Sequence, residues 1–554
     1  MSKYAIGVDY GTLSVRALMV DIHTGEEVAT SVYEYPHGVM EEHIPTGKKL
    51  APGWALQDPQ DYLEGLILTI RNVMAQQKAL PEEVIGIGVD FTSSTVISCK
   101  ADKTPLCHLP EFKDEPHAYV KLWKHHGAEE EAQMIDRIAK ERGESWLSLY
   151  GGKVSSEWMI PKVLETLRHA PEVYAQADRM MEALDWIIWE MTDVESRSAC
   201  GAGYKAFYRH DSGYPSNDFF KALDPRMEHF IEEKMDAPIK AIGETAGYLC
   251  ASMAKQLGLL EGTPVGTGII DAHSSLPGCG IGKPGEMMII VGTSSCHMML
   301  SETEAGIPGV GGLVKDGIMP GYFGYEAGQC CVGDHFAWFV DNCVPESYHQ
   351  EARAKGISVH QLLTEKLKDY KAGQSGLVAL DWFNGVRSPL MDFNLNGLIM
   401  GMNLLTKPEE IYLALIEATA YGTRMIIESF ENAGVHVDSI VLSGGIPVKN
   451  HMLVQVYSDI CKRDIKISAS TQASALGAAI LGIAAASEQV TGYKDANEIA
   501  QKIGQVEDTV FSPNPDNTEV YDKLYAEYKT LHEYFGKGAN DVMKRLNKIR
   551  EERK

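Results

Sequence analysis

The stretch IGVDYGTLSVRALMVD, residues 6–21, joins two apolar runs through a small polar turn. Asp9 closes the first run, and the turn contains Gly11, Thr12 and Ser14. These residue types are typical of an ordinary hairpin, because glycine permits positive φ and short polar side chains bond their own backbone. They also surround phosphates and hydrated magnesium ions in proteins. For a single match, the ordinary hairpin is the favoured interpretation.

A second stretch has the same plan. EMMIIVGTSSCHMMLSE, residues 286–302, places Gly292, Thr293 and Ser294 between two apolar runs. The repeat predicts two lobes, each presenting one small-residue loop, and we expect the two loops to face each other across a cleft.

Acidic residues also close other apolar runs. IGIGVD ends at Asp90 and PVGTGIID ends at Asp271, and their unbroken Val, Ile and Gly content predicts strands buried on both faces. Ligands of such sheets bind at the ends of the strands. We interpret Asp90 as structural, capping backbone groups at its strand end. The segment DSIVLSGGIPVKN, residues 438–450, ends its strand in glycines that admit a flat ligand such as adenine, although a plain turn is the commoner explanation.

Two nucleotide motifs are excluded. No G-x-x-x-x-G-K-[ST] occurs in the chain. The G-x-G-x-x-G match at residues 280–285 contains Pro284 and leads into a strand instead of opening a helix, so we interpret it as a connecting turn.

Four helical segments are expected. Asp58 and Pro59 begin one helix as N-cap and first-turn proline. A capping box at 406–409 begins a second, which Gly434 ends. The small residues of 470–482 predict a helix that packs closely against another element or a nucleotide, and 518–554 reads as a helical tail with a charged end.

Composition bounds the class of protein. The 554 residues are 44% hydrophobic and 23% charged, as in a globular protein long enough for more than one core. The net charge of −25 disfavours nucleic acid and anionic membranes. Ten scattered cysteines predict reduced thiols, with Cys330-Cys331 and His125-His126 as packing and surface groups. No signal-peptide pattern or membrane-length apolar run is found, so we expect a cytoplasmic protein.

Taken together, the two hairpins, the strand ending at Asp271 and the strand–Ser-Gly-Gly turn follow the order found in the sugar-kinase, Hsp70 and actin superfamily. Within it, the chain resembles the FGGY family of carbohydrate kinases over nearly its whole length. Longer and more specific segments carry a closer likeness to kinases of pentulose sugars: VRALMVDIHTGEEVATSV, GIGVDFTSST, LWKHH, YGGKVSSEW, GYKAFY, VGTSSCH and EAGQ.

The resemblance implies an α/β fold with two ribonuclease H-like lobes, and ATP and sugar between them. It implies three domains: an N-terminal lobe over 1–255, a C-terminal lobe over 256–500 and a helical tail over 501–554. The implied partners are ATP, Mg²⁺ and a pentulose, and a homodimer is left open.

The resemblance also implies roles for single residues. Asp9 would hold magnesium through water, and Asp271 would be the catalytic base. The sugar would be bound by Ser93, Lys205, Asp271 and Glu326. ATP would be bound by Gly11, Thr12, Ser14, Gly292, Thr293, Ser294, Gly444, Gly445 and Asn450.

The residues alone leave several alternatives open. Asp271 is also a plausible N-cap for a helix beginning at Ala272. Lys205 is equally a surface lysine beside aromatic residues, and Glu326 suits a loop in a cleft better than a helix face. Arg16 would add charge near the phosphates, pair with Asp21 or lie on the surface, and His273 would touch the sugar or pack.

The expected reaction is therefore transfer of phosphate from ATP to ribulose, giving ribulose 5-phosphate, with L-ribulose ahead of D-ribulose, as in L-arabinose catabolism. The alternatives are a xylulokinase or another FGGY polyol or ketose kinase, and a non-enzymatic, nucleotide-driven clamp of the Hsp70 or actin type.

Overall fold

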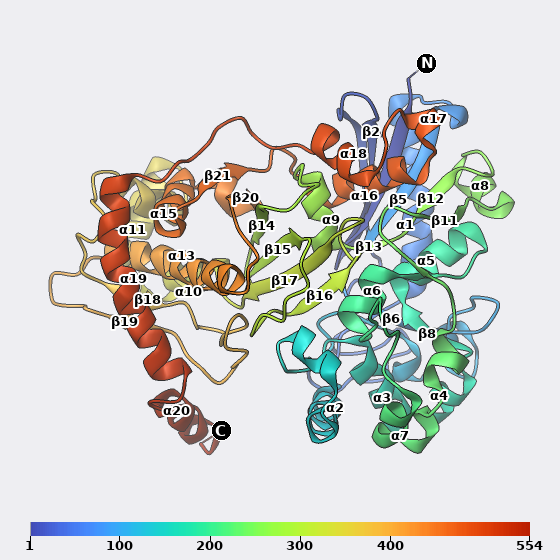
Figure 1. Cartoon of the computed structure of the whole chain (residues 1–554), viewed down its shortest axis with the longest axis horizontal. Coiled ribbons are helices and arrows are strands. Elements are labelled where there is room, and N and C mark those ends of the chain that lie inside the picture. Colours follow the sequence, from blue (N-terminus) through green and yellow to red (C-terminus); the bar gives the residue numbers. More distant parts are fainter. Residues whose placement is uncertain (1, 554) are drawn as a thin grey trace. The chain divides into compact units, whose positions relative to one another are not determined.

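A computed structural model describes residues 2–553 as a mixed α/β protein (Figure 1). The chain divides into two compact units. Unit 1 comprises the chain up to Pro284, together with Gly312–Gly324 and Gln472–Gln505. Unit 2 comprises Gly285–Gly311, Tyr325–Thr471 and the chain from Val506 onward.

The main sheet of unit 1 has the strand order β11-β12-β5-β1-β2-β3, with β13 also paired to β5. The first two strands form the antiparallel hairpin expected from residues 6–21, and β1 runs parallel to β5. The register aligns Asp9 with Asp90, and β13 aligns Ile269 with Asp90. The strands are β1 (Tyr4–Tyr10), β2 (Ser14–Asp21), β3 (Glu27–Glu34), β5 (Val84–Phe91), β11 (Thr245–Tyr248), β12 (Pro264–Gly266) and β13 (Ile269–Ile270).

A second sheet of unit 1 has the order β4-β7-β6-β8, and two short strands, β9 and β10, pair separately. These strands are β4 (Leu56–Gln57), β6 (Val96–Cys99), β7 (Val120–Lys121), β8 (Arg179–Glu182), β9 (Arg197–Ser198) and β10 (Ile239–Lys240). The helices of unit 1 are α1 (Pro59–Gln77), α2 (Glu129–Arg142), α3 (Met159–His169), α4 (Pro171–Gln176), α5 (Ala183–Thr192), α6 (Ala199–Lys205), α7 (Asn217–Leu223), α8 (Ala251–Leu257), α9 (Asp271–Gly278), α16 (Ala473–Ala485), α17 (Glu488–Thr491) and α18 (Ala496–Ile503). Residues 312–324 add β16 (Gly312–Lys315).

Helix α16 lies directly against the main sheet of unit 1. Its backbone comes so close to β1 and β5 that a β-carbon on Gly7, Gly86 or Gly88 would overlap a carbonyl oxygen of the helix. The helix therefore packs on the sheet through small residues, as the composition of 470–482 favoured, and residues far apart in sequence meet in one unit.

This contact moves the predicted boundaries. The sequence predicts boundaries near 255 and 500, whereas residues 256–284 and 472–505 belong to unit 1. Residues 264–270 belong to unit 1 because they form β12 and β13, which pair with β5. Residues 473–485 belong to it because they form α16, which covers the same sheet. The tail from 506 onward belongs to unit 2.

Unit 2 repeats the hairpin arrangement. Its central sheet contains the order β17-β15-β14-β20-β21, in which β14 and β15 form the second expected hairpin and β14 runs parallel to β20. The strands are β14 (Glu286–Val291), β15 (Ser295–Ser301), β17 (Phe323–Gln329), β18 (Val378–Leu380), β19 (Leu398–Met400), β20 (Ser439–Ser443) and β21 (Asp464–Ile467). The helices are α10 (Gly333–Cys343), α11 (Glu346–Lys355), α12 (Val359–Lys366), α13 (Pro408–Asn432), α14 (Gly445–Lys449), α15 (His451–Cys461), α19 (Pro515–Gly536) and α20 (Val542–Glu551).

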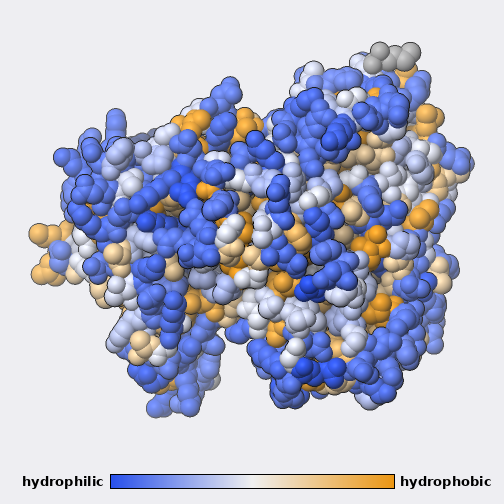
Figure 2. Space-filling view, viewed as in Figure 1, coloured by the Kyte–Doolittle hydropathy of each residue, from blue (hydrophilic) through white to orange (hydrophobic). Residues whose placement is uncertain are grey.

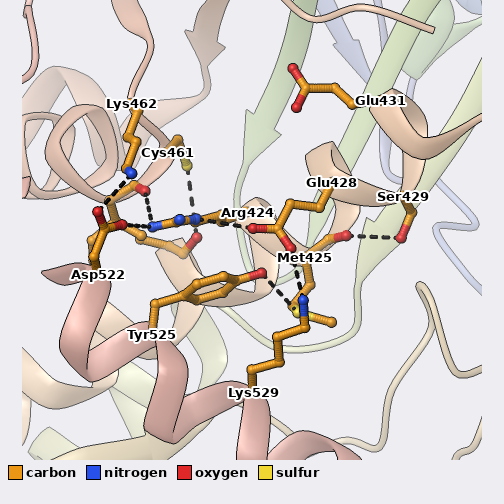
Figure 3. Close-up of polar contacts among 12 residues, drawn as sticks. Arg424, Met425, Glu428, Ser429, Glu431, Cys461, Lys462, Asp522, Tyr525 and Lys529 are labelled. Atoms are coloured by element: carbon orange, nitrogen blue, oxygen red, sulfur yellow. Dashed lines mark hydrogen bonds and ion pairs between the residues drawn. The ribbon is translucent and has the colours of Figure 1, made fainter. Parts of the chain in front are cut away.

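An ionic cluster attaches the long C-terminal helix α19 to α13 and α15 (Figure 3). Arg424 on α13 donates to Asp522 at 2.8 Å, and its guanidinium lies 4.0 Å from the ring centroid of Tyr525. Lys462, just beyond α15, donates to the other oxygen of Asp522 at 2.7 Å. The tail is therefore an integral part of unit 2, which the sequence analysis treated as a separate domain.

The helix signals are confirmed with one correction. Asp58 accepts a hydrogen bond from the backbone N–H of Gln60 and caps α1. The capping box of α13 lies one residue later than expected, because Glu410 accepts from the N–H of Lys407. Thr406 instead accepts from the N–H of Asn403.

All ten cysteines are free thiols, as expected. The face seen in Figure 2 is mostly hydrophilic, with scattered hydrophobic residues. Between residues 2 and 553 no single helix is long and apolar enough to cross a membrane; a bent pair that passes by length and composition includes α16, which is buried in unit 1.

The close approach of α16 gives a first prediction. Gly88→Ala should lower the free energy of unfolding by about 1–3 kcal/mol or more, because the added β-carbon has only backbone to displace. Urea unfolding measures the change. Gly306→Ala is the control, since nothing lies within 4 Å of its added β-carbon. Equal stability of the two variants would contradict the packing described.

Candidate functional site

The first hairpin turn is fixed by a hydrogen bond within the turn and by hydrogen bonds from two neighbouring segments. The N–H of Gly11 donates to the carbonyl of Ser14 at 2.9 Å. Gln57 donates to the carbonyl of Thr12 at 2.8 Å, and the indole of Trp123 donates to its hydroxyl at 3.1 Å. The turn is thus fixed by two neighbouring segments, while its own residues stay partly accessible.

Three acidic side chains meet beside this turn. Asp9 ends β1, Asp90 is its aligned partner on β5, and the charge of Asp271 acts on Asp90. Burial raises the pKa of Asp9, against the opposing effects of Asp90 and Arg16. Burial and the charge of Asp9 raise the pKa of Asp90 well above its ordinary range. The cluster therefore places Asp90 where burial and the neighbouring carboxylates favour its protonated form.

The expected role of Asp90 is wrong. Asp90 is fully buried, and among the described residues no backbone N–H bonds to either of its carboxylate oxygens. It faces Asp9, Asp271 and Ser274 instead of capping its own strand. Arg16 lies near Asp9, with its guanidinium 3.8 Å from that carboxylate. It does not pair with Asp21, which accepts from the N–H groups of His23 and Thr24.

Asp271 is the first residue of helix α9. The N-cap is Ile270, so the alternative of Asp271 as N-cap is not what forms. One carboxylate oxygen accepts from the N–H of Ala272 at 2.7 Å. A carboxylate in the first turn of a helix is favoured by the exposed N–H groups there. This position is part-buried and leaves Asp271 at the edge of the acidic cluster.

Lys205 ends helix α6 and is 5% exposed, so its alternative as a surface lysine is wrong. Its ammonium lies 5.9 Å from the ring centroid of Tyr204. The ring of Tyr204 also contacts His273, whose Nδ1 lies 3.2 Å from Cys200 Sγ. His273, on α9, therefore packs against α6.

Ser93 lies in the turn between β5 and β6 and is partly exposed. Its hydroxyl lies 3.3 Å from that of Ser94. The turn is closed by Thr95, whose hydroxyl donates to the carbonyl of Thr92 at 3.0 Å.

The second hairpin turn, in unit 2, is fixed by the start of helix α10. The N–H of Gly292 donates to the carbonyl of Ser294 at 2.9 Å. The carbonyl of Thr293 accepts from Val332 at 2.8 Å, and that of Gly292 accepts from Gly333 at 2.9 Å. Gly292 and Ser294 are partly exposed, and Thr293 is exposed.

Glu326 lies in strand β17 and not in a loop, which corrects the expectation from its neighbours. Three residues along the same strand, Gln329 is buried. It accepts from Ser295 and Thr423 and donates to Asp381, at 2.9–3.1 Å. The strand carrying Glu326 is thereby joined to the second hairpin and to α13.

The Ser-Gly-Gly turn follows β20 as expected. Gly444 has φ 100°, and a β-carbon there would crowd the backbone of Val291. Gly445 is exposed with open space around it. Asn450 caps α15 by accepting from the N–H of Leu453 at 3.2 Å.

The predicted residues are thus distributed over both units. Unit 1 brings together Asp9, Gly11, Thr12, Ser14 and Asp271, and also carries Ser93 and Lys205; unit 2 carries Gly292, Thr293, Ser294, Glu326, Gly444, Gly445 and Asn450. The burial of Asp90 and the contacts of Gln57 and Trp123 with the turn were not predicted from the sequence. The segment LWKHH was singled out, but no pattern indicated what Trp123 touches.

Comparisons with known proteins agree with this architecture. The model described as "FGGY family of carbohydrate kinases, N-terminal domain" matches residues 4–278, and its C-terminal counterpart matches 287–486. The chain is 50% identical over 539 residues to a protein named ribulokinase of Bacillus licheniformis, covering 97% of this chain and 98% of that protein. It is also 50% identical over 550 residues to one from Geobacillus thermodenitrificans, covering 99% and 97%.

Solved structures show the same fold at lower identity. The xylulose kinase of Rhodospirillum rubrum aligns with a TM-score of 0.78 at 20% identity, covering 96% of this chain and 98% of that one. The glycerol kinase of Plasmodium falciparum, solved with ADP, aligns with a TM-score of 0.75 at 18% identity, covering 96% and 98%.

The acidic cluster gives a prediction on pH dependence. Because folding raises the pKa of Asp90, the folded protein holds a proton that the unfolded chain releases above about pH 4, so stability falls as pH rises from there. Asp90→Asn removes this proton linkage. Without nucleotide or magnesium, we expect the variant to gain stability over the native protein progressively as pH rises from 4 to 8.

Urea unfolding at several pH values measures this difference. Asp508→Asn, an exposed acid of unit 2, is the matched control and should track the native protein at every pH. A constant difference between Asp90→Asn and the native protein across this range would contradict the assignment.

Proposed function

The chain belongs to the FGGY family of carbohydrate kinases, and we propose that it transfers the γ-phosphoryl group of ATP to ribulose, giving ribulose 5-phosphate. The observation that carries the proposal is the position of Asp271, at the start of α9 and beside the acidic cluster and first hairpin. The near full-length identity to proteins named ribulokinase supports ribulose as the acceptor.

The two hairpin turns bind the phosphates in this proposal. Thr12 and Ser14 donate from their hydroxyls, as do Thr293 and Ser294 in unit 2. Gly11 and Gly292 have no side chain, so a phosphate can approach each turn closely. Donors of this kind position the phosphates and neutralise charge, which is most of the catalysis in phosphoryl transfer. Their support is the rigid anchoring of both turns by neighbouring segments.

Asp271 acts as general base in this proposal. It orients the attacking hydroxyl and accepts its proton as the new O–P bond forms. An aspartate with an ordinary pKa is ionised at neutral pH and accepts a proton late in the reaction. The first-turn position on α9 favours this ionised form.

The sugar is bound in this proposal by Ser93, Lys205, Asp271 and Glu326. A buried ammonium is a strong donor to sugar hydroxyl and carbonyl oxygens because little water competes with it. The burial of Lys205 supports this role. Gly444, Gly445 and Asn450 bind the adenosine part, and the open space beside Gly445 supports this assignment.

The donor set of unit 1 fits a hydrated magnesium ion. Asp9 offers one carboxylate beside the phosphate turn, and such an ion needs only one or two because it keeps its waters. Among residues 2–553 no group of three or more His, Cys, Asp or Glu forms a direct metal cage. When bound, magnesium supplies charge neutralisation at the phosphates. Asp9 holds it, and Arg16 keeps that carboxylate paired in its absence.

The setting of the reaction follows from its chemistry. We propose that the protein serves L-arabinose catabolism in the cytoplasm, where ATP and free pentuloses are available. A homodimer is the oligomeric state that we propose.

A sugar panel tests the proposed function. ATPase and phosphoryl-transfer rates should rise with L-ribulose more than with D-ribulose, xylulose, glycerol or gluconate. A coupled assay for ADP release, with sugar phosphate identified by mass spectrometry, measures this. Stimulation by xylulose alone would replace ribulose as the substrate, and no stimulation by any sugar would refute kinase activity toward this panel.

Removing the base tests the role of Asp271. Asp271→Asn should lower kcat by about 10²–10⁴, with little change in ribulose affinity, because it keeps the shape but cannot accept the proton. Steady-state kinetics and ribulose binding by calorimetry give the two quantities. Asp508→Asn serves as the control for a lost surface carboxylate. Near-native kcat in Asp271→Asn would remove it from the role of base.

A further inference from the structure

Lys162 is a buried cation that the proposed mechanism does not use. It lies on helix α3 and is 0% exposed. Its ammonium donates to two backbone carbonyls, Ser94 at 2.7 Å and Leu122 at 2.7 Å. A buried lysine carries a large desolvation cost, so its contacts must offset that cost.

The first carbonyl belongs to the turn that carries Ser93. Ser94 has φ 53°, in the left-handed region that is unfavourable for a residue with a β-carbon. Such a conformation persists only where the surroundings enforce it. The bond from Lys162 to the carbonyl of Ser94 is one such constraint, and it acts on the Ser94–Thr95 peptide, one residue beyond Ser93.

The second carbonyl, that of Leu122, belongs to a segment that contacts the first hairpin turn. Leu122 precedes Trp123, whose indole donates to Thr12 in the first hairpin. One ammonium group therefore joins the turn of Ser93 to the segment that contacts the phosphate-binding hairpin.

Glu182, at the end of β8, supplies the opposing charge. It is 4% exposed, and its charge acts on both Lys162 and Lys205. Burial lowers the pKa of Lys162 to about 7, against the effect of Glu182, and raises the pKa of Glu182 to about 8. The next residue, Ala183, donates its N–H to the carbonyl of Thr95 at 2.6 Å, so the same strand end also fixes the Ser93 turn.

We propose that Lys162 is a positioning residue for the sugar acceptor: its two hydrogen bonds hold the Ser93–Ser94 turn in the geometry that binds the sugar and couple it to the phosphate hairpin. This inference rests on the proposed sugar kinase function. It predicts that Lys162 governs the KM for sugar far more than the KM for ATP.

Lys121 provides a matched control in the same part of the fold. It is 2% exposed on β7, and its ammonium donates to Glu165 at 2.6 Å, to Thr166 at 2.7 Å and to the carbonyl of Lys162 at 3.1 Å. His125 also contacts Glu165, at 3.0 Å, so this histidine is a buried member of the network and not a surface group. None of the hydrogen bonds from Lys121 goes to the Ser93 turn.

The experiment compares Lys162→Met with Lys121→Met in steady-state kinetics. Lys162→Met should raise the KM for sugar by about 10- to 100-fold, as expected for losing hydrogen bonds from a charged donor, and leave the KM for ATP within about twofold. Lys121→Met should lower thermal stability at least as much and leave the KM for sugar near native. Lys162→Gln repeats the measurement if the methionine variant does not fold.

Glycine at the strained position supplies a rescue test. Ser94→Gly removes the steric cost of positive φ, so the double variant Lys162→Met with Ser94→Gly should recover part of the lost sugar affinity. A merely structural role for Lys162 predicts no such recovery. An unchanged KM for sugar in Lys162→Met, or an equal rise in Lys121→Met, would overturn the proposal.

The assay uses whichever ketose the native protein phosphorylates. Activity with xylulose and not ribulose would refute the proposed substrate, and the two lysine variants are then compared with xylulose. The two failures are therefore distinguishable.

Discussion

The architecture of unit 1 depends on the contact between the backbone of α16 and the backbones of β1 and β5. Carbonyl oxygens of the helix come within reach of the strands only because Gly7, Gly86 and Gly88 have no β-carbon. Interiors are close-packed, so a helix seated this deeply cannot shift without opening a cavity on one side. This packing supports β1 and β5, whose register aligns Asp9 with Asp90. It also explains why residues 472–505 belong to the same unit as the N-terminal part of the chain.

That register has an electrostatic consequence. Burial disfavours the ionised forms of Asp9 and Asp90, and repulsion by Asp9 and Asp271 raises the pKa of Asp90 further. Arg16, at 3.8 Å from Asp9, relieves only part of this repulsion. A bound cation favours the ionised carboxylates that burial disfavours, so the magnesium ion proposed for Asp9 would stabilise this site by binding to it.

The sequence predicted what depends on local order and missed what depends on distant partners. Both hairpins formed where the apolar runs and the Gly-Thr turns indicated, because turn chemistry and strand periodicity are local. The prediction for Asp90 was wrong because its neighbours are distant in sequence. They are Asp9 on the parallel strand β1 and Asp271 at the start of α9. The same holds for Lys205, whose burial follows from the packing of α6, and for 472–505, whose place follows from glycines on β1 and β5.

The two units support their hairpins through different chemistry. In unit 2 the neutral amide of Gln329 joins Ser295, Thr423 and Asp381, so hydrogen bonds of an uncharged side chain fix the strand of Glu326. In unit 1 the corresponding task falls to Lys162, a buried ammonium whose charged form Glu182 favours. A charged donor makes stronger bonds to carbonyls than an amide does, and it holds a turn that includes the strained Ser94. The buried charge of Lys162 therefore supports a turn whose backbone conformation is unfavourable. The neutral Gln329 supports a strand that is already fixed by its pairing.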